Sequence, residues 1–339
     1  MIHTIRPALM LCAILAVALL LAGSGVGVAQ DEGAWPVKGK IIGKKDKKSE
    51  DVSGIACTRP AGFPRSCLLI DDEIQSAQMV TLEDGKLHAG GLVPLIENTF
   101  DGKPLELDGE GVAYADGFFY VIGSHGHPRN AGDAAKVAAR IAASSQIVRL
   151  KVDPESGEPL PDRDTPDIAR SAKLKELFEG EAELAPFVDK PLDENGITIE
   201  GVAVQDGRLF AGFRGPSLNG AAPVLSVSLG VLFGNAPADA RVHLLQVGTG
   251  QGIRDLAAFR SGLLVLAGPT ADHGGRYEVY WWDTSADAVK LLGAIDDENG
   301  QVKPEAILPL DEGAETLRVL VLFDGVKEGG PRTFEVSLP

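Results

Sequence analysis

Short apolar segments recur along this chain in pairs, and each pair opens with a polar residue. The second segment begins about 14 residues after the first and runs into a polar loop. Five copies follow one another at roughly 50-residue spacing, and their opening segments are Ser53–Ala56, Glu110–Ala113, Glu200–Ala203, Asp255–Ala258 and Glu305–Leu308. One copy cannot bury its own apolar face, so the copies must pack against one another around an axis.

Each copy can be read as four antiparallel strands, which is the composition of a propeller blade. The pattern therefore predicts an all-β fold, a single β-propeller with five blades. Six blades are the alternative, because the segment 124–198 is longer than its equivalents. Within it, 131–143 and 167–184 have helical composition and predict two short helical insertions in the second blade, whose last strand is expected near Leu184–Val188.

The last copy has one strand too few at the C-terminus. An unpaired sheet edge would remain there, so the missing strand is expected from the other end of the chain. Near that end, Pro36–Ile42 is the predicted partner of Thr333–Leu338.

The first 29 residues have the composition of a secretory signal. Arg6 gives a positive start, Leu9–Ala22 is almost entirely apolar, and Gly27, Val28 and Ala29 are small enough for cleavage. A retained membrane anchor is the alternative, but the apolar run is shorter than the ~20 residues that a spanning helix needs. We expect a periplasmic or secreted propeller domain over residues 30–339.

Two cysteines, Cys57 and Cys67, remain after the signal. Ten residues separate them across a predicted hairpin, which allows their Cα atoms to come within bridging distance. Exported proteins fold in an oxidising compartment, so a Cys57–Cys67 disulfide is expected.

The chain is strongly acidic. It has 32 Lys and Arg against 48 Asp and Glu, a net charge of −16. This charge opposes binding to nucleic acid or to an anionic membrane surface, and we expect neither as a partner once the signal is removed. A monomer is expected.

In a propeller, the start of the innermost strand and the end of the second strand lie at the same end of the central channel. The polar openers and the loops that follow the second segments should therefore share one rim. The residues predicted to bind a ligand there are Glu110, His125, Arg129, Glu200, Arg214, Asp255 and Glu305, and His273 lies in one of the same loops. A small molecule or a protein could be the ligand.

Several carboxylates around one axis repel one another and need compensation. They could accept bonds from backbone amides at blade junctions, form ion pairs with Arg129, Arg214 or Arg254, or hold a metal or cationic ligand. Calcium is the cofactor considered, with Asp71, Asp72 and Asp324 as candidate metal ligands. The turns Asp193–Gly196 and Asp296–Gly300 have part of a calcium-loop composition, but Asp/Asn-Gly is also common in plain turns, the interpretation favoured here.

No nucleophile elbow, zinc-protease helix, phosphate-binding loop or dinucleotide fingerprint occurs in the chain. No complete pair of nucleophile and base can be written, so a binding module is the favoured hypothesis. The alternative is a hydrolase of esters or phosphoesters that uses a metal such as calcium.

Two motifs carry a resemblance to a known family. Asp108–Ala113 with Gly123–His125, and Gly196–Ala203 followed by Gly212–Pro216, resemble a bacterial exported family classed as a domain of unknown function and regarded as propeller-like. That likeness implies the fold and the domain boundaries. More distantly, the segment of acid, glycine, hydrophobe and alanine is similar to that of phytase-like esterase propellers, which implies calcium-assisted phosphoester chemistry at an acidic rim.

Overall fold

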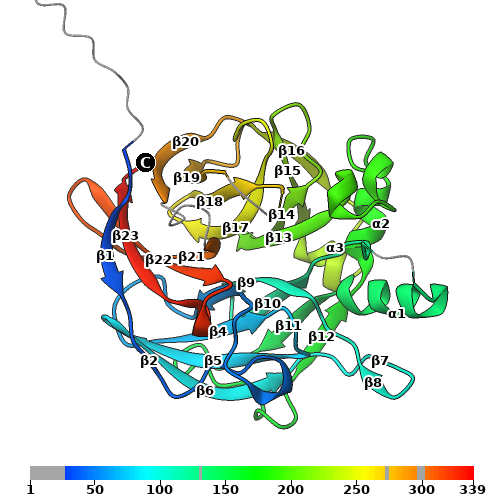
Figure 1. The fold of residues 1–339 in the computed structure, drawn as a ribbon, viewed down its shortest axis with the longest axis horizontal. Coiled ribbons are helices and arrows are strands. Elements are labelled where there is room, and N and C mark those ends of the chain that lie inside the picture. Colours follow the sequence, from blue (N-terminus) through cyan, green and yellow to red (C-terminus); the bar gives the residue numbers. More distant parts are fainter. Residues whose placement is uncertain (1–26, 130–131, 272–274, 296–301) are drawn as a thin grey trace, which may run out of the picture.

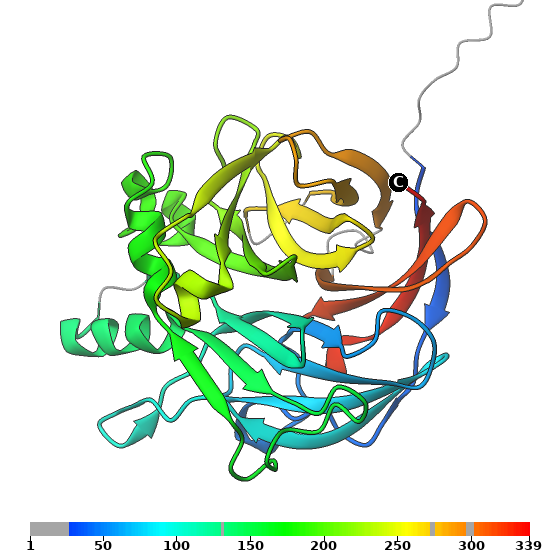
Figure 2. The same ribbon diagram turned by 180° about the vertical axis from the view of Figure 1, so that it is seen from behind.

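The five recurring units form five blades around a central channel, so the predicted all-β propeller is confirmed (Figures 1 and 2). The structure is a computed structural model that describes residues 27–129, 132–271, 275–295 and 302–339. The innermost strands of neighbouring blades pack against each other all the way round, from β3 through β9, β13, β17 and β21 back to β3. Five blades therefore close the ring.

Each blade runs from an innermost strand outward through antiparallel neighbours. In blade one these are β3 (Val52–Cys57), β4 (Arg65–Asp71), β5 (Ser76–Glu83) and β6 (Lys86–Pro94), with β2 (Val37–Lys38) added in parallel. In blade two they are β9 (Gly109–Ala115), β10 (Phe118–Gly123), β11 (Ile147–Lys151) and β12 (Ile168–Ser171). In blade three they are β13 (Thr198–Gln205), β14 (Arg208–Gly215), β15 (Ala222–Ser228) and β16 (Arg241–Leu245).

Blade four contains β17 (Gln251–Phe259), β18 (Gly262–Pro269), β19 (Tyr277–Trp282) and β20 (Lys290–Ile295). Blade five contains β21 (Lys303–Glu312), β22 (Thr316–Asp324), β23 (Arg332–Ser337) and β1 (Gln30–Ala34). A small hairpin, β7 (Thr99–Phe100) and β8 (Lys103–Pro104), lies between blades one and two in the sequence. The helices are α1 (Ala134–Ser144), α2 (Lys173–Glu179) and α3 (Leu229–Phe233), with short 3₁₀ turns at Lys44–Asp46, Ala185–Phe187, Leu192–Glu194 and Lys327–Gly329.

The hydrophobic core is divided among the junctions between blades. Five clusters of buried side chains each draw on two adjacent blades, as Leu68 and Val121 do between blades one and two. Alternate residues of an innermost strand point to opposite sides of the sheet, so Val202 joins one cluster and Ala203 the next. This explains why no single copy of the repeat can be stable alone.

The ring is closed by an N-terminal strand, as predicted, but the segment expected to form it was wrong. Gln30–Ala34 pairs with β23, whereas Val37 and Lys38 of the expected segment pair with β6 of blade one. The side chains of Gln30–Ala34 are all exposed. An outermost strand is held by backbone hydrogen bonds rather than by burial, so its side chains carry no pattern that identifies it.

The last strand of blade two was also misplaced. It is Ile168–Ser171, while the expected segment forms the 3₁₀ turn at Ala185–Phe187 and places Leu184 in the core between blades two and three. The predicted helical insertions are present as α1 and α2, on the outside of the ring (Figure 1).

The predicted disulfide joins Cys57 and Cys67, which face each other across β3 and β4. The signal predicted over residues 1–29 falls almost entirely outside the described residues. Of the helices in the described ranges, none is long and apolar enough to cross a membrane.

Candidate functional site

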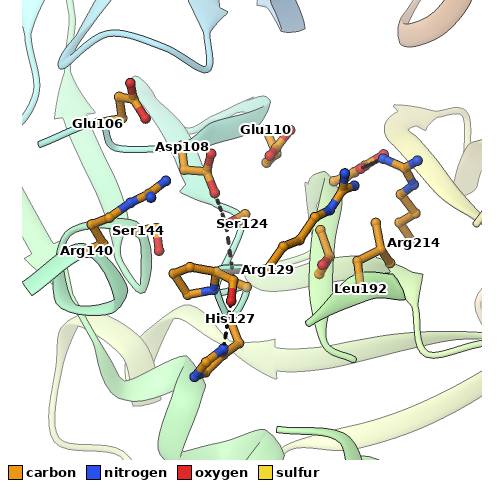
Figure 3. A pocket seen from close by; sticks show the side chains of 14 residues that line it. Glu106, Asp108, Glu110, Ser124, His127, Arg129, Arg140, Ser144, Leu192 and Arg214 are labelled. Atoms are coloured by element: carbon orange, nitrogen blue, oxygen red, sulfur yellow. Dashed lines mark hydrogen bonds and ion pairs between the residues drawn. The ribbon is translucent and has the colours of Figure 1, made fainter. Parts of the chain in front are cut away.

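A polar cavity of about 260 Å³ opens where the innermost strands of blades two and three begin (Figure 3). Four carboxyl groups line it: Glu106, Asp108, Glu110 and Glu200. Three guanidinium groups line it as well: Arg129, Arg140 and Arg214. Hydroxyl groups of Ser124, Ser144 and Thr198 and the ring of His127 complete the polar wall. Four of the seven residues predicted to bind a ligand line this one cavity: Glu110, Arg129, Glu200 and Arg214.

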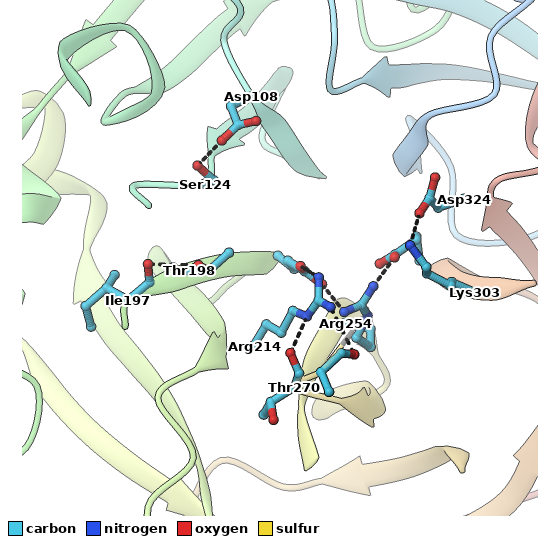
Figure 4. A network of polar contacts seen from close by, with 12 residues as sticks. Asp108, Ser124, Ile197, Thr198, Arg214, Arg254, Thr270, Lys303 and Asp324 are labelled. Carbon is cyan, nitrogen blue, oxygen red and sulfur yellow. Dashed lines mark hydrogen bonds and ion pairs between the residues drawn. The ribbon is translucent and has the colours of Figure 1, made fainter. Parts of the chain in front are cut away.

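The end of β10 and the loop after it form one wall, where the backbone passes very close to the end of α1 and to the segment before β9. A Cβ atom at Gly123 would lie 2.1 Å from the carbonyl oxygen of Ser144 and 2.8 Å from that of Leu107, so only glycine fits. The next residue, Ser124, donates its backbone N–H to the carbonyl of Asp108 over 2.8 Å. Its hydroxyl donates to the Asp108 carboxylate, and this bond appears in Figures 3 and 4.

Helix α1 brings a residue to the cavity that pattern reasoning missed. The helix begins at Asp133, whose side chain accepts the backbone N–H of Lys136 over 2.9 Å, a normal N-cap. Arg140 and Ser144, at i and i+4, lie on one face of the helix and line the cavity. Nothing in the sequence ties this insertion to the channel, so its contribution could not be predicted.

Glu200 lies in a buried network of opposite charges (Figure 4). Arg214 Nη1 lies 2.9 Å from Glu200 Oε1, and Arg254 Nη1 lies 3.0 Å from Glu200 Oε2. Arg254 also pairs with Glu305, and Arg214 donates to the backbone carbonyls of Thr270 and Ala271. Two arginines thus compensate two carboxylates across blades three, four and five, which is the ion-pair alternative considered above.

Glu110 stands in a different environment. Burial and the nearby carboxyl groups of Asp108, Glu200 and Asp72 raise its pKa well above the usual range, and Arg254 opposes that rise. The pKa of Asp108 is raised too, by burial, although the bond from Ser124 lowers it. Among the described residues, no side chain donates a hydrogen bond to Glu110. The neutral form of the Glu110 carboxyl, which lines the cavity, is therefore favoured over the ionised form.

Asp72 extends the acidic region toward blade one. Its pKa is raised to about 9 by burial and by repulsion from Asp108, Asp51, Asp71 and Asp324, and its Oδ1 atom is buried without a hydrogen-bond partner in the described structure. Asp71 accepts the Ser49 hydroxyl over 2.6 Å and the Glu73 N–H over 3.0 Å, and burial raises its pKa to about 6.

The candidate calcium ligands are not gathered into one set. Asp324 lies 2.8 Å from Lys303 Nζ as an ion pair, and Asp71 is bonded as described above. In the described ranges, no three His, Cys, Asp or Glu side chains are grouped so that they could hold a metal ion.

The other predicted ligand residues lie beside the cavity rather than in its wall. Asp255 is 2% exposed and accepts the backbone N–H groups of Leu256 and Ile307, so it joins blade four to blade five. His125 is also buried, with its ring against Phe178, and burial lowers its pKa to about 4. Glu305 is buried against Arg254. His273 and the turn Asp296–Gly300 lie outside the described residues.

Asp108 is the site residue that the sequence could have revealed. It lies only two positions before the predicted opener Glu110, and this closeness in sequence is the signal that could have drawn attention to it. His127 belongs to the loop already singled out. Glu106, Leu192 and Thr198 carry no pattern that marks them.

Solved structures with a similar arrangement of strands include enzymes and an allergen. An exo-β-1,3-galactanase from Phanerochaete chrysosporium is 9% identical with a TM-score of 0.47, over 91% of this chain and 64% of that one. A family 117 glycoside hydrolase from Zobellia galactanivorans is 12% identical with a TM-score of 0.44, over 91% of each chain. The major allergen Mala s 1 of Malassezia sympodialis is 10% identical with a TM-score of 0.44, over 88% of this chain and 81% of that one. Likenesses this weak carry no argument about activity.

Comparison with curated proteins finds no match. A family model does match, over residues 65–332. This range includes four of the five innermost strands and every residue that lines the polar cavity. The chain belongs to the family described as "Protein of unknown function (DUF3616)".

Proposed function

We propose that this protein is a binding module that holds a small polar ligand in the cavity at the mouth of its channel. The observation that carries the proposal is Glu110, a carboxyl group placed in the cavity by an innermost strand and left without a side-chain donor among the described residues. Glu110 is half-buried, and a desolvated polar group without partners is costly, so a ligand that bonds to it removes that cost. The leader-like segment 1–29 supports a location outside the cytoplasm.

The distribution of charge favours one orientation of the ligand. Asp108 and Glu110 meet at the blade-two wall, while Arg129 lies between Glu110 and Arg214 in Figure 3. An amino group or several hydroxyl groups would suit the carboxyl side, because a cation beside Glu110 and Asp108 would favour their ionised forms. An anionic or hydroxyl group would suit Arg129 and Arg140, since guanidinium groups bind such oxygens through paired N–H donors.

The size of the cavity supports a small molecule rather than a protein partner. A volume of about 260 Å³ is close to the low end of ligand pockets, which span roughly 300–1,000 Å³. Stable protein interfaces instead bury surfaces of roughly 1,200–2,000 Å², far more than a cavity of this size presents.

The test is a thermal-shift screen of amines, sugars, amino sugars, carboxylates and phosphate esters, followed by calorimetry on each compound that raises the melting temperature. Glu110→Gln should weaken binding of such a compound at least tenfold, since it removes the group that can become a carboxylate. Glu155→Gln, at an exposed loop position, is the matched control and should bind normally. A compound bound equally by wild type and by both Glu110→Gln and Arg129→Gln would contradict this site.

A second candidate, hydrolysis of an ester or acetal bond, has one specific observation in its favour. Glu110, with its raised pKa, and Glu200, paired with two guanidinium groups, line the same cavity. Carboxyl groups with such contrasting environments are typical of acid–base catalysis, with Glu110 here as the proton donor to the leaving oxygen. Chromogenic nitrophenyl esters, phosphates and glycosides would be assayed, and Glu110→Gln should lower any turnover by about 10²–10⁴.

A further inference from the structure

A second cavity, of about 300 Å³, occupies the opposite end of the channel. It is lined by the later halves of all five innermost strands, whereas the polar cavity lies at the beginnings of two of them. No residue lines both cavities. This second cavity is therefore a separate feature of the molecule.

The repeat itself explains why this end is open and apolar. The fourth position of the five opening segments holds Ala56, Ala113, Ala203, Ala258 and Leu308, and all five line the cavity. Small side chains at four of these positions leave space along the axis.

The second position of the repeat brings the strands together instead. A Cβ atom at Gly54 would lie 2.9 Å from Gly111 Cα, and one at Gly111 would lie 3.0 Å from the backbone nitrogen of Val202. The innermost strands of blades one, two and three are thus in backbone contact at this level, with the carboxyl groups on one side and the alanines on the other.

The charge at the mouth of this apolar cavity is positive, although the chain carries −16 overall. Arg59 and Arg65 are the charged residues among those that line it, and no carboxyl group of the described residues does. Arg65 is buried and fixed by bonds to the carbonyls of Gly62, Pro309 and Leu310, so its charge is held in place. Arg59 is exposed and donates to the carbonyl of Pro64.

We propose that this cavity binds one anionic amphiphile, with its apolar chain in the channel and its carboxylate or similar head group at Arg59 and Arg65. Burial of the amphiphile's apolar chain supplies affinity in proportion to the apolar area removed from water. The two arginines favour a negatively charged head group over an uncharged one. A cavity with mainly apolar walls and a few polar groups at one end is the usual form of a site for such molecules.

The probe is octanoate, titrated into the protein by calorimetry, with octanol as its uncharged counterpart. We expect one octanoate per chain and weaker binding of octanol. Ala258→Phe should abolish both, because Ala258 is exposed to the cavity and an aromatic ring there would fill it. Arg59→Gln should weaken octanoate about fivefold to tenfold and leave octanol unchanged, as expected for one exposed charge pair of about 1 kcal/mol.

Two controls show whether the effects arise at this cavity. Arg163→Gln replaces an arginine that lines neither cavity, and it should bind octanoate like wild type. Circular dichroism checks that each variant is folded. The proposal fails if octanoate does not bind, if Ala258→Phe binds it normally, or if octanol binds as well as octanoate.

Discussion

At the scale of single residues, the channel mouth combines two ways of placing carboxyl groups in the interior. Glu200 and Glu305 form buried ion pairs with Arg214 and Arg254. Glu110 and Asp72 lack such partners among the described residues, and their raised pKa values show that their neutral forms are favoured. Carboxyl groups of the second kind reduce the stability of the folded protein near neutral pH, a common property of binding and catalytic sites.

Replacement of Asp72 should reveal this cost. In the unfolded chain Asp72 ionises above about pH 4, whereas in the folded protein its pKa is about 9. The free energy of unfolding therefore falls as pH rises between these values, because the unfolded chain releases a proton that the folded protein retains. Asp72→Asn should be more stable than wild type by about 1–2 kcal/mol at pH 8 and equal to it at pH 4.

Urea unfolding at the two pH values measures the effect of the Asp72→Asn substitution on the free energy of unfolding. Asp116→Asn, at a turn between β9 and β10, is the control and should change stability little at either pH. A loss of stability in Asp72→Asn at pH 8 would mean that Asp72 is ionised and compensated in the folded protein.

His125 should produce the opposite dependence on pH. Its folded pKa is about 4, below the value of about 6.5 expected when unfolded. The unfolded chain thus binds a proton that the folded protein does not, and stability falls as pH drops from 6.5 to 4, by up to about 1.4 kcal/mol per pH unit. His125→Asn suits the backbone φ of 54° and should lack this contribution. The free energy of unfolding of wild type and of His125→Asn is measured with urea from pH 7 to 4.5. If the two curves run parallel, His125 does not contribute to the pH dependence of stability.

At the scale of elements, the sequence predicted strands well where a strand is buried and less well where it is held by backbone bonds alone. The innermost strands, such as β13, were located by their polar opener and the apolar run that follows it. The run is apolar because both faces of such a strand pack against a core cluster. The outermost strands β1 and β12 are partly or wholly exposed, and both were misplaced. The walls supplied by α1 could not be predicted, since a helical pattern gives no information about which blade the helix covers.

The closing strand can be tested with two chains that differ only at their start. A chain that begins at Gln30 retains β1, while one that begins at Trp35 exposes the edge of β23. We expect the shorter chain to lose a few kcal/mol of stability and to self-associate through the free edge. Size-exclusion chromatography and urea unfolding compare them, and identical behaviour would show that β1 is not needed for closure.

At the scale of the whole molecule, the channel has two chemically different ends. The repeat places mostly acidic residues at its first position and small apolar residues at its fourth, so a polar and an apolar cavity follow from one motif. The rim was predicted from this topology. The different roles of the acidic openers were not predicted. Glu110 lines a cavity, whereas Asp255 accepts backbone N–H groups. Which role an opener takes depends on its partners in neighbouring blades.

The pairing of β1 with β23 also determines the order in which the molecule can be assembled. Gln30 pairs with Glu335, so β1 has no partner until β23, which follows the other strands of the described structure in sequence, has been made. Contacts between such distant positions form slowly, because the ends of a very long loop must meet. Until that time blade five is incomplete and the ring is open. The last event in folding is therefore expected to be the pairing of β1 with β23.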